Sequence, residues 1–462
     1  MSGGQRLALA ATWMASAMTV TLMTLSEHFR IVLIDVALQV DSGTMAVMAV
    51  LGEIVLVCVT VVVATVVAQL AFGQAVDELR QQIALRRLVG SKRAAERRGL
   101  FGRFAATGAI GAVAGYGTGA ALSALATQAL RSALPEWSAA PLPSLQPGAI
   151  IPAVGVAIGA LLAAWGASRN VLGVAPLEAL ADAQVDSRFA RPARLTGGLV
   201  TVSVGVALLA AGVALGFFTP QAVLVGVVGG AVTVFGIVAL ATPATSAMLK
   251  LFKWPLQGSA VGRSAYGSLV RAPHRVGGIT IALTVGIAAV TMFAVAGETA
   301  QSVLLGMVDH VDIRADQEAA LNEMTAQLMT VVSLAVACGS GVAVFGFIAT
   351  MLMSVRARTR EIGLMRLVGM RVKQARSMIV VETAVIAALA MIGGLALGIL
   401  FGWLGTFMML GSVAGIGVML PQLPWSLVPA LLVATALVAT ATAVPAARRA
   451  SGIPPLAAVN AA

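Results

Sequence analysis

The sequence predicts an all-α integral membrane protein with ten transmembrane helices. Of its 462 residues, 59% are hydrophobic and only 11% are charged, and the mean hydropathy is +0.95. A globular domain of this composition would lack the polar surface that keeps it in solution. Long uncharged runs, each able to supply at least one span of roughly 20 residues, recur along the chain. A shift of 279 positions also superimposes two parts of the sequence, which indicates an internal duplication.

We expect the helices to follow a 4+2+4 arrangement, two four-helix repeats with two spacer helices between them. The corresponding units are 1–185, 186–255 and 256–462. An even number of spacer helices returns the chain to the same side of the membrane, so the two repeats are parallel and related by an axis along the membrane normal. The uncharged runs place the spans at about 7–25, 44–72, 104–130, 137–168, 195–218, 221–249, 276–296, 326–355, 382–410 and 425–446.

The distribution of basic residues predicts the topology. Of the 30 Lys and Arg, 27 lie in the two termini and in the loops at 73–103, 168–194, 250–275 and 356–376. By the positive-inside rule these segments are cytoplasmic, so both termini are cytoplasmic and the protein belongs in the cell membrane. The net charge of +11 is therefore explained by topology, and we expect the lipid bilayer and not nucleic acid as the partner of these charges.

Two of the cytoplasmic loops carry the duplicated sequence. Residues 80–97 and 358–376 carry the same pattern, and an offset of 279 aligns apolar, basic and glycine positions of the two copies. The first copy contributes Ile83, Leu85, Arg87 and Gly90. The second copy contributes Glu361, Ile362, Leu364, Met365, Arg366 and Gly369.

The pattern of the second copy predicts a short docking helix. Its apolar residues form a broad arc at 100° per residue, which can seat in the groove of a partner. Gly369 is placed to end the helix in the left-handed conformation. The alternative is a basic loop that only fixes topology and touches anionic headgroups. That role requires no repeated Leu, Val and Gly, so we favour docking.

Glycines at four-residue spacing predict close helix packing in both repeats. Gly115 and Gly119 of the first copy align with Gly394 and Gly398 of the second, at the same offset. Small residues at this spacing let a neighbouring helix approach closely.

Two acidic residues stand out near or within apolar spans. Glu53 lies about eight residues inside the second span, where a charge costs roughly 2.5–3.5 kcal/mol. It either faces a cavity as a polar contact for substrate or makes a hydrogen bond between helices. Glu382 is expected to begin the ninth helix, where its charge suits a helix N-terminus. Cys58 and Cys338 lie in apolar spans, the three histidines are isolated, and no metal site is expected.

Residues 360–369, REIGLMRLVG, with the basic segment, Glu382 and the Gly-rich helix that follow, resemble the FtsX-like (MacB-type) permease domain of ABC transporters. The first copy departs from the pattern, because Gln82 stands in place of the acid at Glu361. The resemblance implies that the loop between the second and third helices of each copy is a coupling helix for a cytoplasmic ATPase. It also implies conformational work carried through the membrane.

The sequence indicates that nucleotide chemistry belongs to the partner. No lysine occurs in a GxxxxGK[ST] phosphate-binding loop, so we expect no enzyme activity and no cofactor in this chain, with ATP and Mg²⁺ bound by the ATPase. Two copies of the ATPase are expected per chain, one for each repeat.

Three function classes remain open from the sequence. The first is the permease subunit of an ABC transporter that exports or extracts an amphipathic lipid, peptide or drug. The second is a mechanical transmembrane regulator of a cell-wall enzyme. The segments expected outside, 26–44 and 298–325, are short, which weakens this class and favours substrates handled at the bilayer. The third is an ion-coupled secondary transporter, which usually requires more intramembrane charge than Glu53.

The topology is testable by cysteine labelling. In a chain whose two native cysteines are replaced by alanine, a membrane-impermeant maleimide should label Gln317→Cys in intact cells and spare Arg371→Cys. The expectation follows from the distribution of basic residues. Labelling at 371 together with protection at 317 would reverse the assignment.

Overall fold

The computed structural model describes residues 5–6, 8–21, 23–24, 43–133, 147–170, 192–271, 273–308, 371–414 and 420–452. Every regular element in this part of the chain is helical, and seven helices are long and apolar enough to cross a bilayer. Two further apolar helices in this part of the chain, Ala8–Thr21 and Leu427–Ala441, are shorter. The eighth expected span, about 326–355, lies outside the described residues, so the count of ten and the 4+2+4 arrangement stay predictions.

In the part of the chain that the structure describes, the unit expected at 1–185 contains four helices longer than one turn. The N-terminal helix Ala8–Thr21 is followed by α2 (Gly43–Leu88), α3 (Arg93–Ala133) and α4 (Ile150–Asn170), the last preceded by the 3-10 turn η2 (Pro147–Ala149). All four contribute to one buried cluster. At its centre the rings of Phe72 and Phe104 lie 5.1 Å apart, joining α2 to α3.

The spacer consists of α5 (Pro192–Gly216), α6 (Ala222–Ala239) and α7 (Ala241–Leu249). We expected α6 and α7 as one helix, but the chain breaks at Leu240. Pro243 accounts for the break, because its ring clashes with the carbonyl of the residue four positions earlier. Helical bonding resumes where the amide of Ala244 donates to the Leu240 carbonyl oxygen at 3.0 Å.

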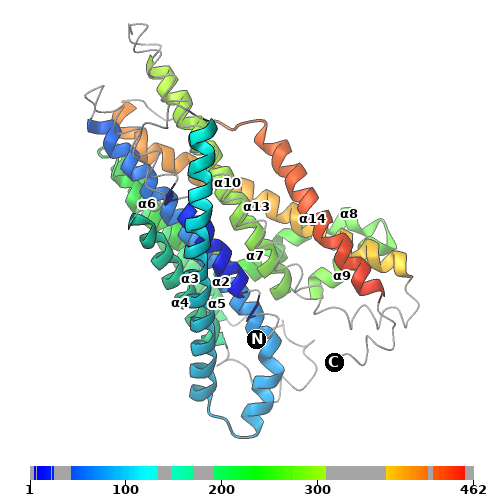
Figure 1. Cartoon of the computed structure of the whole chain (residues 1–462). Helices are drawn as coiled ribbons and strands as arrows, with labels where there is room; N and C mark the ends of the chain where they lie inside the picture. Colours follow the sequence, from blue (N-terminus) through cyan, green and yellow to red (C-terminus); the bar gives the residue numbers. More distant parts are fainter. Residues whose placement is uncertain are drawn as a thin grey trace.

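A bent connection precedes the second repeat. It comprises η5 (Lys250–Phe252), α8 (Lys253–Gln257) and α9 (Ala260–Arg271). The repeat itself contains α10 (Pro273–Val308), α13 (Val372–Ala414) and α14 (Leu427–Gly452). Figure 1 shows α10 and α13 crossing the middle of the bundle, with α8, α9 and α14 on one side of it.

Helix α10 lies at the junction of the two repeats. In its most apolar stretch 78% of the residues are buried, against 22–44% in the other candidate spans. Ile281, Val285 and Ala289 pack into the cluster of the first repeat. Ile279 and Leu283 belong to the cluster formed with α13 and α14. The helix therefore shares its two faces between the two repeats.

Glycines mark the closest helix contacts in both repeats. A Cβ added to Gly119 of α3 would lie 2.6 Å from the Ala17 carbonyl oxygen, and one added to Gly115 would meet the Trp13 carbonyl oxygen. Atoms at these distances overlap, so α3 can approach the N-terminal helix only because these positions lack a Cβ.

The second repeat has an equivalent close contact, and we call each of these glycine-lined helix contacts a seam. A Cβ on Gly394 of α13 would lie 2.6 Å from Ile287 Cβ, and one on Gly398 would lie 2.7 Å from the Ala288 carbonyl oxygen of α10. In each repeat the Gly-rich helix therefore packs on the first helix of the same repeat.

Threonine hydroxyls inside the helices are satisfied locally. Thr60 Oγ1 donates to the Leu56 carbonyl oxygen at 2.8 Å, and Thr383 Oγ1 donates to the Ile379 carbonyl oxygen at 2.8 Å. A donor in hydrocarbon has no water to bond, so this bond to the preceding turn lets polar side chains occupy apolar spans.

Two acidic residues differ from the sequence expectation. Glu382 was expected at the start of a helix, but α13 begins ten residues earlier and the Glu382 side chain is 2% exposed. Its expected interaction with a helix N-terminus is therefore wrong. Glu298 was expected just beyond the seventh span, and it lies within α10, because the helical run continues to Val308.

The seam can be tested with a matched pair of alanine substitutions in α3. Gly119→Ala inserts a methyl group against the N-terminal helix and should lower the free energy of unfolding by about 1–3 kcal/mol, the usual cost of overpacking. Gly117→Ala adds the same group where nothing lies within 4 Å. Thermal unfolding in detergent should show a lower midpoint for the first variant only.

Alanine is favoured over glycine in a helix by about 1 kcal/mol, so Gly117→Ala should be neutral or stabilising. Equal stability of the two variants would contradict the seam.

Candidate functional site

The first basic patch lies at the tip of a helical hairpin. We expected α2 to end near Phe72, but it continues as one helix to Leu88, and α3 begins at Arg93. Figure 1 shows the two helices extending together past the ends of the neighbouring helices to a turn at the bottom of the view. The patch is therefore part of a long transmembrane helix and not a separate short helix. We call residues 79–100 the coupling hairpin.

Glycine ends the descending helix of the coupling hairpin. Gly90 has φ 105°, in the left-handed region, and the amide of Ser91 donates to the Arg86 carbonyl oxygen at 3.0 Å. A bond that spans five residues with a glycine in this conformation is the Schellman helix end. Nothing lies within 4 Å of a Cβ at Gly90, so the requirement for glycine is conformational.

Three apolar side chains are exposed at the tip. Val89 is 91% exposed, and Leu85 and Leu88 are about half exposed. Ile83 was expected among the docking residues, but it is only 3% exposed. It belongs to the same buried cluster as Leu100, because at the helical period it faces α3 while Leu85 faces away.

The charges around this tip are mostly basic. Arg86 Nη1 lies 3.9 Å from Glu96 Oε2 and links the two helices, but at this distance and exposure the pair adds little stability. Exposed Lys92, Arg93 and Arg98 follow on the α3 side. The side chain of Arg87 lies outside the described residues. A partner would thus meet an apolar tip inside a basic rim.

The equivalent residues of the second copy lie outside the described part of the chain. They are Glu361, Ile362, Leu364, Met365, Arg366 and Gly369. The helix that follows them is described, and it begins at Val372, which is offset by 279 from the start of α3 at Arg93. The Arg371 amide donates to Gln374 Oε1 at 3.0 Å, as in half of a capping box. The duplicated register therefore continues into the structure.

Glu53 lies on α2, far from the coupling hairpin. Its side chain is half-buried. A Cβ at the preceding Gly52 would lie 3.9 Å from Met409 Cε of α13. This part of α2 therefore lies close to the second repeat, which leaves the role of Glu53 in substrate contact as a hypothesis. Glu382 lies on α13, two to three turns from the first residue of that helix.

Two residues at the hairpin tip were not among the expected coupling residues. Leu88 and Val89 belong to the repeated Arg-Leu-Val-Gly segment and recur in the second copy as Leu367 and Val368. Their repetition next to a helix-ending glycine is the sequence signal that could have added them to the site. The apolar tip combines these two residues with Leu85.

The chain was also compared with known proteins. The model of the FtsX-like permease C-terminal region matches twice, at residues 54–176 and 333–455, which together cover more than half of the chain. The two matches are offset by 279 positions, the offset found in the sequence. No curated protein matches the chain.

Substitution of Gly90 tests the geometry of the tip. An L-residue in the left-handed conformation costs about 1–2 kcal/mol, so Gly90→Ala should raise local opening of the turn roughly 5- to 30-fold. Hydrogen exchange of peptides covering the turn should become faster by this factor. Gly99→Ala, in the helical part of α3 with nothing within 4 Å, is the control and should not accelerate exchange. Unchanged exchange in Gly90→Ala would contradict the assigned helix end.

Proposed function

The chain belongs to the FtsX-like permease family, and from this premise we propose that it couples ATP hydrolysis by a cytoplasmic ATPase to movement of an amphipathic substrate. Membership implies a multi-pass membrane protein that is the permease component of an ABC transporter. Such a component normally works with a cytoplasmic ABC ATPase and is not itself catalytic. The finer proposal concerns where the ATPase docks, how force is transmitted and what is moved.

The coupling hairpin is the proposed docking site. The observation that supports it most is the exposure of Leu85, Leu88 and Val89 at the tip of a protruding, basic hairpin. Burying one such side chain stabilises a complex by about 1.5–3 kcal/mol, whereas an exposed ion pair contributes about 1 kcal/mol or less. The apolar tip would therefore provide most of the affinity, and the basic rim would orient the partner.

Helix α2 is suited to transmit force from this tip. It runs without a break from Gly43 to Leu88 and contains no proline, unlike the α6–α7 segment that Pro243 interrupts. It contacts α4 in its own repeat, and it contacts α6 and α10 beyond it. Displacement of the tip would thus move the interface between the repeats.

Two ATPase copies are proposed per chain, because the docking sequence occurs twice at one offset. ATP and Mg²⁺ would be bound in those partners, since the chain has no GxxxxGK[ST] motif. Both termini are proposed to be cytoplasmic. In support, the start of the N-terminal helix and the end of α14 lie toward the hairpin end of the bundle (Figure 1).

An amphipathic lipid, peptide or drug is the proposed substrate class. The short segments at 26–44 and 298–325 leave little chain to build an outer domain that would reach a distant partner. The substrate would therefore be bound and moved within the bilayer or at its surface. Glu53 is proposed as a polar contact for it, near the place where α2 meets α13.

Docking can be tested by charge insertion at the apolar tip. The chain would be purified with its co-purifying ATPase, and the ATPase-to-chain ratio measured by quantitative mass spectrometry. Leu85→Asp should remove the first ATPase and Leu364→Asp the second, because an interface anchor is worth roughly 2 kcal/mol or more. Each single variant should reduce the ratio from two to one.

Gln82→Asp is the matched control, since it places the same charge on an exposed polar residue of the same hairpin. It should retain the ratio of the unmodified chain. Full two-to-one binding by both leucine variants would refute docking at these tips, and equal loss in the control would show a general charge effect.

A further inference from the structure

The connection between the spacer and the second repeat is unusually basic. We call residues 250–271 the elbow; it comprises η5, α8 and α9. It contains Lys250, Lys253, Arg263 and Arg271, and the sequence holds no acidic residue from 187 to 297. The elbow's positive charge is therefore not neutralised by neighbours along the chain.

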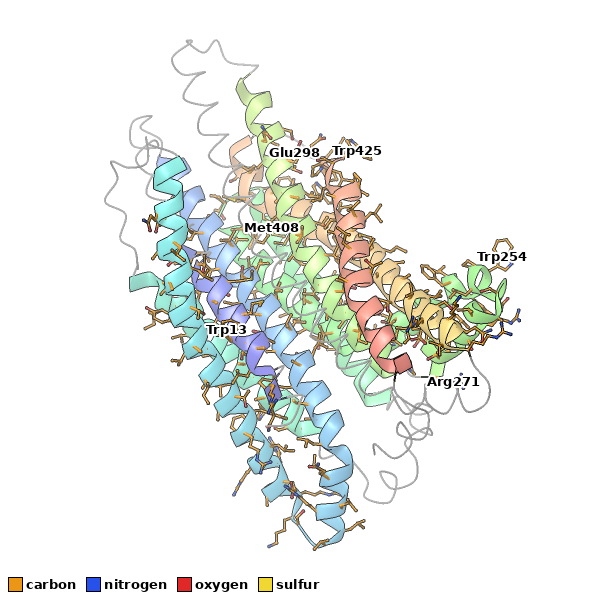
Figure 2. The ribbon with its side chains drawn as sticks, turned by 45° about the vertical axis from the view of Figure 1, so that its right-hand side comes forward. Trp13, Trp254, Arg271, Glu298, Met408 and Trp425 are labelled. Carbon is orange, nitrogen blue, oxygen red and sulfur yellow. The ribbon has the colours of Figure 1, made fainter. Side chains whose placement is uncertain are left out.

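Large apolar side chains project from the elbow beside these charges. Trp254 is 87% exposed and Leu251 is 69% exposed, and both are adjacent to an exposed lysine. Figure 2 shows Trp254 at the edge of the molecule, pointing away from the bundle. Exposed tryptophan and leucine are unfavourable in water, whereas tryptophan with its polar N–H is favoured at the membrane–water boundary.

Helix α9 holds the elbow against the bundle. Its buried face, which includes Ala265 and Leu269, packs in the cluster that contains α13 residues, and α9 contacts α13 directly. The opposite stripe exposes Arg263, Val270 and Arg271. The helix therefore lies with one face on protein and one face turned outward.

The two arginines are oriented by backbone carbonyls. Arg263 Nη1 donates to the Gln257 carbonyl oxygen at 3.2 Å, and Arg271 Nε donates to the Gly267 carbonyl oxygen at 3.0 Å. A guanidinium carries five N–H donors, so one such bond fixes the side chain and leaves donors for a phosphate. These arginines are thus partly preorganised.

The elbow also immediately precedes a candidate membrane span in the sequence. It leads directly into α10, a candidate span that starts at Val276. In Figure 2, Arg271 and Trp254 lie at the right-hand side of the molecule, away from Glu298 and Trp425, which lie near its upper end.

We propose that the elbow is a binding site for anionic phospholipid headgroups, with its basic residues on the phosphates and Trp254 and Leu251 inserted among the acyl chains. Charge complementarity favours lipid as the partner. An anionic leaflet offers phosphates to a basic segment that has no acid near it in the sequence, and it offers acyl chains to the exposed apolar side chains. The inference goes beyond the proposed transport function and needs only that the chain spans a bilayer. No ATPase is required for its test.

The test measures which lipid lies next to the elbow. A bimane label is attached at Leu251→Cys in a full-length chain whose Cys58 and Cys338 are replaced by alanine. The protein is reconstituted in vesicles of phosphatidylglycerol and phosphatidylcholine at equal mole fractions, with only one of the two lipids brominated. Each basic residue near an anionic surface contributes roughly a fivefold preference, so quenching by the brominated anionic lipid should exceed quenching by the zwitterionic lipid severalfold.

Two controls separate a local site from general attraction. A label at Trp425→Cys, 82% exposed in a stretch without Lys or Arg from 377 to 447, should show no preference. Lys250→Gln with Lys253→Gln and Arg263→Gln should remove the preference at 251. The same loss of charge at Arg93, Arg97 and Arg98 should preserve it.

Equal quenching by the two lipids at 251 would overturn the proposal. A preference that survives neutralisation of the elbow, or that is as large at 425, would also overturn it. Because the ATPase is absent, each of these results leaves the docking proposal untouched, and failure of docking leaves the lipid site standing.

Discussion

The continuity of α2 is the constraint on which the proposed coupling mechanism depends. A bilayer requires roughly 20 helical residues, yet α2 has 46, so about half of it lies beyond the hydrocarbon region. Hydrogen bonds within the helix satisfy the backbone throughout, and no proline interrupts them. The buried cluster extends to Ile83 and Leu100, which holds α3 against α2 close to the turn. The tip is therefore fixed to the transmembrane helix without a flexible joint.

The two repeats share the same helix contact, but different side chains surround it. Both place glycines of the third helix on the first helix. In the first repeat, hydroxyl groups reinforce the seam, because Ser16 Oγ donates to the Ala112 carbonyl oxygen at 2.8 Å. In the second, Ile287 occupies the position facing Gly394, and Thr406 Oγ1 reaches the Ala296 carbonyl oxygen only at 3.3 Å. The first helix of the second repeat, α10, also carries the contacts to the first repeat, so the repeats are related in register but unequal in burial.

Sequence periodicity predicted most of the helices and the repeat, because span length, charge distribution and glycine spacing are local signals. It did not predict that Ile83 faces α3, since the burial of one side of an amphipathic helix depends on a partner elsewhere in the chain. The sequence predicted that α2 would end, and that α13 would begin, where the apolar run stops. Both helices extend beyond that point, because a helix continues into water when tertiary packing supports it. Glu382 was misplaced for this reason. The break at Leu240 was predictable from Pro243, whose effect is local.

Rigidity of α2 is the central claim, and a distance measurement tests it most directly. Nitroxides at Val50→Cys and Arg86→Cys, in a chain without Cys58 and Cys338, should be separated by about 54 Å along a continuous helix. Both positions are exposed. Pulsed electron paramagnetic resonance of the chain with its ATPase should give one narrow distance that is the same with and without ATP. A broad or bimodal distribution, or a change of a helical turn or more on ATP binding, would contradict rigid transmission.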